Sequence, residues 1–333
     1  MQVTIIGAGV AGLTTALELA RRGIVVDVLE RGTRLGMFAC SVQAGGMIAP
    51  WCELEIAGEN IARLGEISLP WWRENFPGLV QKGSLVVAPA RDEKELARFA
   101  LRTRNFTWIA RSDIESLEPD LSPHFSKALY FANEAHLDPR AVLAALADKL
   151  KEMGVSLRFG INGQNVAVKE GWIVDCRGLA ARDMLPELRG VRGETVTVKA
   201  RDINFTRPVR FLHPRFPLYV VPRGDNTYML GATVLESESR ARIAVRSAVE
   251  LLNAAYALHP AFAEAEIIEM GADLRPAFPD NEPRITQQGQ RLFINGLYRH
   301  GFLTAPALAQ KAADIITGRT GVSNADLSQR EMA

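Results

Sequence analysis

The chain has 333 residues, which at about 150 residues per domain corresponds to roughly two domains. Its 39 basic and 38 acidic residues give a formal net charge of +1, so no strong field attracts nucleic acid or an acidic membrane surface. A hydrophobic fraction of 47% and a charged fraction of 23% exclude a disordered chain, a collagen-like repeat and a coiled coil.

The first thirty residues predict a strand, a helix and a second strand. Residues 3–6 are apolar and β-rich, residues 13–20 carry leucine and alanine at helical spacing up to Gly23, and residues 25–29 are again strand-like. This order is typical of a parallel sheet built from βαβ units. The apolar run 3–17 follows no basic residue and is too short to cross a membrane, so we expect a cytosolic protein without a membrane span.

Three helices and a strand are predicted between residues 53 and 154. Residues 53–74 have a mostly helical pattern, and Pro70 is expected to end this helix. Its expected inward positions are Ile56, Ile61, Leu64 and Ile67. A strand over 83–88 follows, and then a surface helix within 91–104. Asp138 and Pro139 suit the start of a helix that ends at Gly154. Its expected inward positions are Val142, Leu146, Leu150 and Met153.

The second half of the chain predicts a central strand followed by an antiparallel sheet. Residues 171–178 read as a strand that runs into a glycine turn. Short β-like runs at 196–198, 218–221 and 228–230 alternate with turn residues, which favours antiparallel pairing. A helix over 242–257, a strand over 292–295 and a helix over 306–317 complete the series, with Gly318 as the last helix end.

A glycine motif joins the first predicted strand to the first predicted helix. Residues 7–12 read G-x-G-x-x-G, and Glu30 follows at the end of the second strand. Gly7 permits a tight turn, Gly9 lets backbone approach a pyrophosphate, and Gly12 allows close packing of helix on strand. The helix N-terminus would face the phosphates while Glu30 accepts a hydrogen bond from a ribose hydroxyl. The motif therefore predicts a bound dinucleotide; the alternative is a glycine turn needed only for packing.

Two further segments favour FAD over NAD. Residues 40–53 (CSVQAGGMIAPWCE) contain a Gly45-Gly46 pair that allows backbone to pass close against a flat ligand. Residues 296–306 (GLYRHGFLTAP) lead from a strand into a helix and offer more backbone N–H groups. A ligand touched from the N-terminal turn and from both of these segments must be large, and FAD fits this better than NAD.

At these residues the sequence resembles the D-amino-acid oxidase superfamily of FAD-dependent oxidoreductases, and within it the glycine oxidases of the thiamine-pathway type. The resemblance covers nearly the whole chain, through GAGVAGLTTALELARRG, LERG, AGGMIAP, YVVPR, GAT, LRP and YRHGFLTAP. It implies an α/β fold in which a Rossmann-like FAD-binding domain with a glutathione-reductase-like βαβ sheet carries an inserted α+β substrate domain on a mostly antiparallel sheet. We assign residues 1–78, 130–188 and 270–333 to the FAD-binding domain, and 79–129 and 189–269 to the substrate domain.

The resemblance also implies which residues bind the cofactor and the substrate. The FAD contacts would be Gly7, Gly9, Val10, Ala11, Gly12, Glu30, Arg31, Cys40, Ser41, Gly45, Gly46, Met47, Gly178, Leu297, Tyr298, Arg299, His300, Gly301, Phe302 and Leu303. The substrate contacts would be Arg275, Tyr219, Arg299 and Met47. Relatives with covalently attached flavin carry a cysteine near the position of Arg275; none stands there in this chain, so we expect non-covalent FAD. The adenine contact that relatives take from the region of residues 160–175 is not assigned.

The chemistry of arginine supports the choice of Arg275. A guanidinium binds a carboxylate through two parallel charge-assisted hydrogen bonds, which fixes both the position and the direction of a small zwitterion. The alternatives are a surface ion pair for Arg275 and Arg299, and a core tyrosine with a satisfied hydroxyl for Tyr219.

The expected reaction is oxidation of glycine or a small N-substituted glycine. A hydride would pass from the α-carbon to flavin N5, and the imine would hydrolyse to glyoxylate plus ammonia or an amine, while O2 is reduced to H2O2. No side chain is predicted to act as an obligatory acid or base. Oxidation or dehydrogenation of sarcosine, iminodiacetate or D-alanine remains open, as does a non-catalytic dinucleotide-binding protein. The electron acceptor and the formation of a homo-oligomer are also open.

The cysteines and histidines predict neither a disulfide framework nor a metal site. Cys40, Cys52 and Cys176 are an odd number without ligand spacing, and the five histidines are scattered. Cys52 lacks a nearby activating base, so we interpret it as a packing residue rather than a nucleophile.

Overall fold

The first of two compact units is built on a six-stranded sheet. The computed structural model describes residues 1–121, 123–166, 171–213, 215 and 217–319. Within them, one unit comprises residues 1–42, 140–190 and 275–319, and the other comprises 43–139 and 191–274, each with the gaps just given. Among the residues described, no helix is long and apolar enough to cross a membrane.

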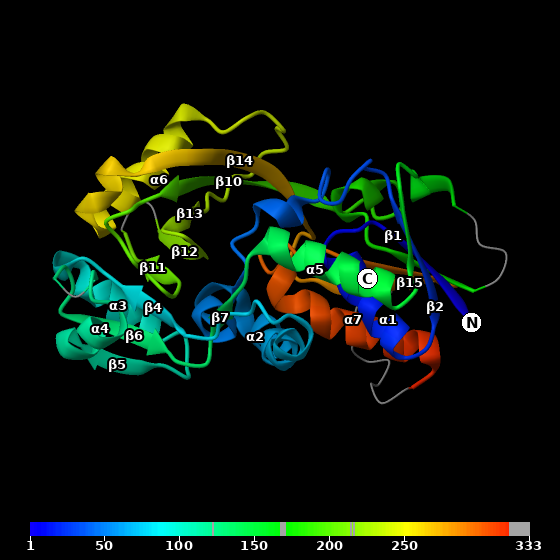
Figure 1. Ribbon diagram of the computed structural model, residues 1–333, viewed down its shortest axis with the longest axis horizontal. Helices are drawn as coiled ribbons and strands as arrows, with labels where there is room; N and C mark the ends of the chain where they lie inside the picture. Colours follow the sequence, from blue (N-terminus) through cyan, green and yellow to red (C-terminus); the bar gives the residue numbers. More distant parts are fainter. Residues whose placement is uncertain (122, 167–170, 214, 216, 320–333) are drawn as a thin grey trace. The chain divides into compact units, whose positions relative to one another are not determined.

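Parallel pairing dominates the six-stranded sheet (Figure 1). Its order is β15 (Arg284–Gln288), β16 (Arg291–Asn295), β9 (Trp172–Asp175), β1 (Gln2–Ile6), β2 (Val25–Glu30) and β8 (Ser156–Phe159). Only β15 and β16 are antiparallel to each other. Residue Ile5 pairs with Val28 on one side and with Val174 on the other, and all three are buried. The predicted α/β fold with a parallel nucleotide-binding sheet is therefore confirmed, including the central place of β9.

Two helices from opposite ends of the sequence pack together in this unit. Helix α1 (Val10–Arg21) and helix α7 (Gly301–Thr317) lie side by side (Figure 1). The guanidinium of Arg22 joins them by donating to Asp314 at 2.6 Å. Helix α5 (Pro139–Glu152) begins at the predicted proline, and Gly318 ends α7 in the left-handed conformation.

The second unit is built on an eight-stranded sheet with mostly antiparallel pairing. Its order is β14 (Glu266–Ala277), β10 (Arg189–Lys199), β13 (Thr227–Gly231), β12 (Leu218–Gly224), β11 (Val209–Phe211), β4 (Ser84–Val87), β6 (Lys127–Phe131) and β5 (Thr107–Ala110). The pairing of β11 with β4 is parallel. The antiparallel sheet predicted from the alternating short runs is confirmed. Its core includes Leu85, Val196, Val220 and Phe211, all nearly inaccessible to solvent.

The helices of the second unit are α2 (Pro50–Asn75), α3 (Glu93–Ala100), α4 (Arg111–Leu117) and α6 (Val245–Leu258). A separate pair of short strands, β3 (Met47–Ile48) and β7 (Ala135–His136), is antiparallel. Residues 43–78, 130–139 and 270–274 fall in the second unit, whereas the sequence analysis assigns them to the FAD-binding domain.

Helix α2 differs from its prediction in two ways. It continues past Pro70 to Asn75, because the proline removes a single N–H while burial of Trp71 and Trp72 stabilises the final turn. Gly58 interrupts the helix at φ +79°, which shifts the phase of the inward face. The prediction that Ile56 and Ile67 face inward is therefore wrong, since they are 50% and 39% exposed.

Two other boundaries also differ. Helix α7 begins at Gly301 rather than Pro306, because the carbonyl of His300 already accepts the N–H and the hydroxyl of Thr304. Met153 was expected on the inward face of α5, but it lies beyond the helix end and is 41% exposed.

Candidate functional site

The glycine motif forms the turn between β1 and α1, and its three glycines have different roles. Gly7 has φ +104° and its N–H donates to Leu29 O at 2.8 Å, so the turn is tied to β2. A Cβ on Gly12 would lie 1.9 Å from Gly7 O, which makes glycine necessary for helix-to-turn packing. At Gly9, with φ −80°, a Cβ would meet nothing closer than Ser41 Oγ at 3.4 Å. Packing within the protein therefore does not require glycine at position 9, and the prediction that a pyrophosphate approaches this backbone offers a separate reason for it.

Glu30 lies beside this turn, as predicted. Its carboxylate accepts from Ala8 N at 2.9 Å and from Gly32 N at 2.8 Å, and the residue is buried. Each oxygen can accept a further hydrogen bond, so a ribose hydroxyl remains a compatible partner. The next residue, Arg31, is exposed and lies with its guanidinium 4.8 Å from the ring centre of Phe38.

Residues 40 and 41 reach the same turn. Cys40 begins a short 3-10 helix (Cys40–Gln43), and Ser41 Oγ accepts from Val10 N at 3.2 Å. The start of α1 is therefore in direct contact with this segment, although more than twenty residues separate them in sequence.

The segment 297–303 meets the glycine motif from the far end of the chain. A Cβ on Gly301 would lie 3.5 Å from Val10 Cγ1, so the N-termini of α1 and α7 are neighbours. The first N–H groups of both helices have no carbonyl partner within their own helix. Leu297, His300, Phe302 and Leu303 are buried, whereas Tyr298 and Arg299 are half-buried.

Arg275 is placed near the segment 297–303 because the next residue, Pro276, is hydrogen-bonded to Tyr298. Tyr298 adopts φ +48° and its N–H donates to Pro276 O at 3.0 Å. Pro276 Cγ in turn lies 3.6 Å from a Cβ built on Gly178. Arg275 itself is half-buried near the end of β14. The first unit therefore brings together the glycine motif, Glu30, Ser41, Gly178, the segment 297–303 and the LRP segment.

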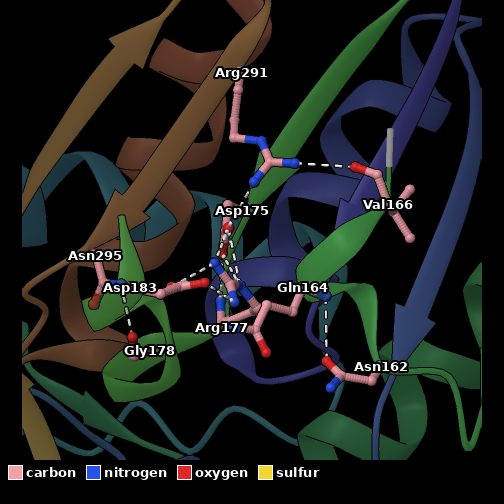
Figure 2. Close-up of polar contacts among 9 residues, drawn as sticks. All are labelled: Asn162, Gln164, Val166, Asp175, Arg177, Gly178, Asp183, Arg291 and Asn295. Atoms are coloured by element: carbon pink, nitrogen blue, oxygen red, sulfur yellow. Dashed lines mark hydrogen bonds and ion pairs between the residues drawn. The ribbon is translucent and has the colours of Figure 1, made fainter. Parts of the chain in front are cut away.

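A buried ionic network beside Gly178 was not predicted from the sequence (Figure 2). The guanidinium of Arg177 bonds both oxygens of Asp175, at 3.0 and 2.9 Å, and both oxygens of Asp183, at 2.9 and 3.1 Å. Asp175 is fully buried, and Arg291 approaches it at 3.7 Å while donating to Val166 O at 3.1 Å. Burial lowers the pKa of Arg177, but both carboxylates raise it, and the net shift is upward.

This network fixes the turn that follows β9. Asn295 Nδ2 donates to Gly178 O at 2.9 Å from the neighbouring strand end (Figure 2). The available signal was an aspartate at the end of an apolar strand with an arginine two residues later, in GWIVDCRG. Part of the 160–175 region, residues 167–170, lies outside the described residues.

The second unit holds Gly45, Gly46, Met47 and Tyr219. A Cβ on Gly45 would lie 2.9 Å from Met229 Cε, and one on Gly46, at φ +70°, would lie 2.2 Å from Leu137 O. Close packing inside this unit therefore requires glycine at position 46, where the clash is with backbone, whereas the flexible end of Met229 could move away from a side chain at position 45. Met47 is half-buried and pairs with His136.

Tyr219 belongs to a polar cluster on β12 and α2. Its hydroxyl donates to Glu53 Oε1 at 2.9 Å, and the guanidinium of Arg210 lies 5.3 Å from its ring centre. Arg210 donates to Cys52 O at 3.0 Å and to Glu55 at 3.2 Å. The hydroxyl is thus satisfied within the protein, and its role toward a substrate stays a prediction.

A buried carboxyl group caps the start of α2. Glu134 is fully buried and accepts from Trp51 N at 3.1 Å, from Cys52 N at 2.7 Å and from Ser84 Oγ. Burial raises the pKa of Glu134 to about 8, although the hydrogen bonds from Ser84 and the helix N-terminus oppose the shift. Burial likewise raises the pKa of the Cys52 thiol, which supports its interpretation as a packing residue.

The described residues include groups that fit FAD. They contain no group of three or more histidine, cysteine or acidic side chains that could hold a metal. The open approach at Gly9 and the two adjacent helix N-termini suit a pyrophosphate, and Glu30 suits a ribose.

Comparison with known proteins agrees with this geometry. Residues 2–315 match the family model described as FAD dependent oxidoreductase (DAO). A Rhizobium etli protein provisionally named thiamine biosynthesis oxidoreductase ThiO is 51% identical over 94% of this chain and 95% of its own length. A glycine oxidase of Pseudomonas aeruginosa is 29% identical over 96% of this chain and 95% of its own.

Solved structures show the same fold. A glycine oxidase from Bacillus cereus superposes with a TM-score of 0.83 over 100% of this chain and 99% of its own, at 23% identity. Because the family model covers residues 2–315, nearly the whole chain, this protein belongs to the family of FAD dependent oxidoreductases related to D-amino-acid oxidase.

Proposed function

We propose that this enzyme oxidises glycine, or a small N-substituted glycine, in the manner of a thiamine-pathway glycine oxidase. The observation that carries the proposal is the 51% identity to the Rhizobium etli protein over 94% of this chain and 95% of the relative. The predicted products are glyoxylate and ammonia, or a primary amine when the substrate nitrogen is substituted. Water supplies the carbonyl oxygen, and O2 takes up two electrons and two protons as H2O2.

The cofactor would be held mainly by backbone groups of the first unit. The first N–H groups of α1 and α7 are suited to anionic parts of FAD, and Glu30 to a ribose hydroxyl. The turn at Gly178, fixed by the Arg177 network, supports the proposal that this backbone also contacts the cofactor. When bound, FAD supplies the hydride acceptor and returns the electrons to oxygen.

Substrate binding is assigned to Arg275, with help from Tyr219, Arg299 and Met47. Arg275 would form two parallel hydrogen bonds to the carboxylate, which sets the direction of the α-carbon as well as its position. The assigned role of Tyr219 toward a substrate carboxylate would require its hydroxyl to leave Glu53. Arg299 and Met47 would border the substrate and limit its size.

Proton transfer from the substrate nitrogen is assigned to solvent. The amine must lose its proton before the hydride leaves, and none of the residues assigned here carries a base for that step. Positioning by the chain, rather than acid–base catalysis, would then account for the protein's contribution.

The decisive experiment is anaerobic reduction of the purified holoenzyme. Glycine should bleach the flavin absorption without oxygen, and admission of oxygen should restore it with equimolar H2O2 and glyoxylate. Sarcosine, iminodiacetate and D-alanine serve as comparison substrates. If none of the four bleaches the flavin, the proposed function is refuted; if another of them reacts faster than glycine, the substrate assignment moves to that amine.

A further inference from the structure

Arg223, the last residue of the YVVPR motif, has no role in the function proposed above, yet its side chain is almost completely buried at 11% exposure. The pairing of β12 with β13 shifts register between Pro222 and Gly224, so Arg223 has no counterpart on β13. An extra residue of this kind bends the strand and redirects a side chain.

The redirected guanidinium contacts two segments that are far apart in sequence. Nη2 donates to Gly45 O at 2.8 Å and to Ala44 O at 3.2 Å, while Nη1 donates to Leu137 O at 3.3 Å. Nε lies 3.7 Å from Asp138 Oδ2. The planar guanidinium can serve acceptors on both segments at once because its N–H groups point in fixed, divergent directions.

These two segments flank the short strand pair β3–β7. Each strand has two residues, with Met47 opposite His136 and Ile48 opposite Ala135. A pair of strands this short is marginally stable by itself, and β7 has one further backbone partner, because Val80 and His136 exchange hydrogen bonds at 2.9 and 3.0 Å. Leu137 N donates to Gly46 O at 2.9 Å, which adds one backbone hydrogen bond beyond the strand pair. Next to this bond, Arg223 donates to carbonyls of both segments, namely those of Ala44 and Gly45 on one and that of Leu137 on the other. The arginine therefore closes the end of the pair at which Gly45 and Gly46 lie.

We propose that Arg223 is a positioning residue that fixes the backbone of residues 44–47, so that Gly45, Gly46 and Met47 take the conformation needed beside FAD and the substrate. The effect on FAD and substrate rests on the proposed function, whereas the clamp on the backbone does not. Arg223 acts through the glycine segment and is not assigned a contact with the substrate.

The clamp is tested first without cofactor. Hydrogen–deuterium exchange of the apoenzyme is compared for wild type, Arg223→Ala and the control Arg201→Ala. Arg201 belongs to the same unit, is 72% exposed and pairs with Glu266 at the surface. Peptides covering residues 44–48 and 135–138 should exchange at least severalfold faster in Arg223→Ala alone. Unchanged exchange in both peptides would overturn the clamp.

The functional consequence is tested by reconstitution with FAD. Loss of several hydrogen bonds from a charged donor should weaken FAD binding about tenfold or more in Arg223→Ala and shift the visible flavin spectrum, with Arg201→Ala unchanged. Low millimolar guanidinium should partly restore both properties in Arg223→Ala. Wild-type affinity and spectrum in Arg223→Ala would refute the positioning role.

A third variant covers the case in which Arg223→Ala does not fold. Arg223→Lys keeps the charge but cannot reach carbonyls on both segments, so it should bind FAD with an affinity between wild type and the alanine variant, and raise KM for the amine more than it lowers kcat. An Arg223→Lys enzyme identical to wild type in FAD affinity, spectrum and KM would also refute the proposal. Exchange and FAD binding need no amine substrate, so failure of the proposed glycine oxidation leaves both tests decisive.

Discussion

Replacing Glu134 by glutamine should remove a pH-dependent loss of stability. Between pH 4.5, the ordinary pKa of the group, and about 8, the folded protein holds one proton more on this side chain than the unfolded chain does. The free energy of unfolding therefore falls as pH rises through this window, by about 1.4 kcal/mol per pH unit and at most about 5 kcal/mol in all. The stabilising contribution is complete below pH 4.5 and gone above the folded-state pKa.

Glutamine places an amide oxygen where Glu134 has the carboxyl oxygen that accepts from Trp51 N and Cys52 N, and it has no titratable proton. Its NH2 group can donate to Ser84 Oγ. The variant should therefore show no corresponding slope. Buried His136 changes stability in the opposite direction, because burial lowers its pKa to about 4 from 6.5 and stability rises with pH across that interval. Wild type and Glu134→Gln both contain His136, so its contribution cancels in the difference between their unfolding free energies.

The assay is the thermal midpoint of wild type, Glu134→Gln and the exposed control Glu264→Gln between about pH 6.5 and 8.5. Ionisation of Glu134 lowers wild-type stability by about 2 kcal/mol from pH 6.5 to its pKa near 8. At about 2.1 cal/mol/K per residue, the unfolding entropy of 333 residues is about 0.7 kcal/mol/K, so Glu134→Gln should gain about 3 °C relative to wild type over this range. A midpoint difference that stays constant with pH would show that Glu134 is already ionised in the folded protein.

Three further predictions concern the cofactor and substrate residues. Gly9→Ala should leave the melting temperature of the apoprotein unchanged but weaken FAD binding. Gly12→Ala should instead destabilise the apoprotein itself by about 1–3 kcal/mol or more, because the new Cβ would meet Gly7 O. Equal effects of the two substitutions on stability and FAD binding would contradict the assigned roles. Arg177→Ala should lower the unfolding free energy by about 3–5 kcal/mol in denaturant titrations, since the buried Asp175 keeps only the backbone N–H of residue 177 at 3.2 Å and its longer pair with Arg291. A neutral result would refute a structural role for the network. Arg275→Ala should raise KM for glycine steeply while FAD stays bound, and loss of FAD instead would place the residue at the cofactor.

Local features of this protein were predictable from sequence because each depends on neighbouring residues. The turn at Gly7 and the helix end at Gly318 follow from backbone conformations that glycine permits. The parallel sheet followed from the spacing of its apolar runs. Pro70 misled the prediction for α2, because burial of the tryptophans beyond it outweighs one missing hydrogen bond.

The buried polar contacts could not be predicted, because their partners lie far away in the sequence. Glu134 is 82 residues from Cys52, and Arg223 is 178 residues from Gly45. A single sequence gives no signal for such pairs, since an arginine or glutamate that will be buried has the same local pattern as one that will be exposed. These contacts nevertheless determine how the backbone around the predicted cofactor residues is held.

The order of strands in the six-stranded sheet affects how the protein matures on the ribosome. Strand β1 is translated first, but its neighbour β9 begins at Trp172, and helix α7, which covers α1, begins at Gly301. A nascent chain that already contains the whole glycine turn and β2 therefore still lacks α7, so the face of α1 that packs on α7 stays uncovered until translation is nearly finished. A chain that ends before Gly301 would therefore contain the glycine turn but lack the helix that packs against α1.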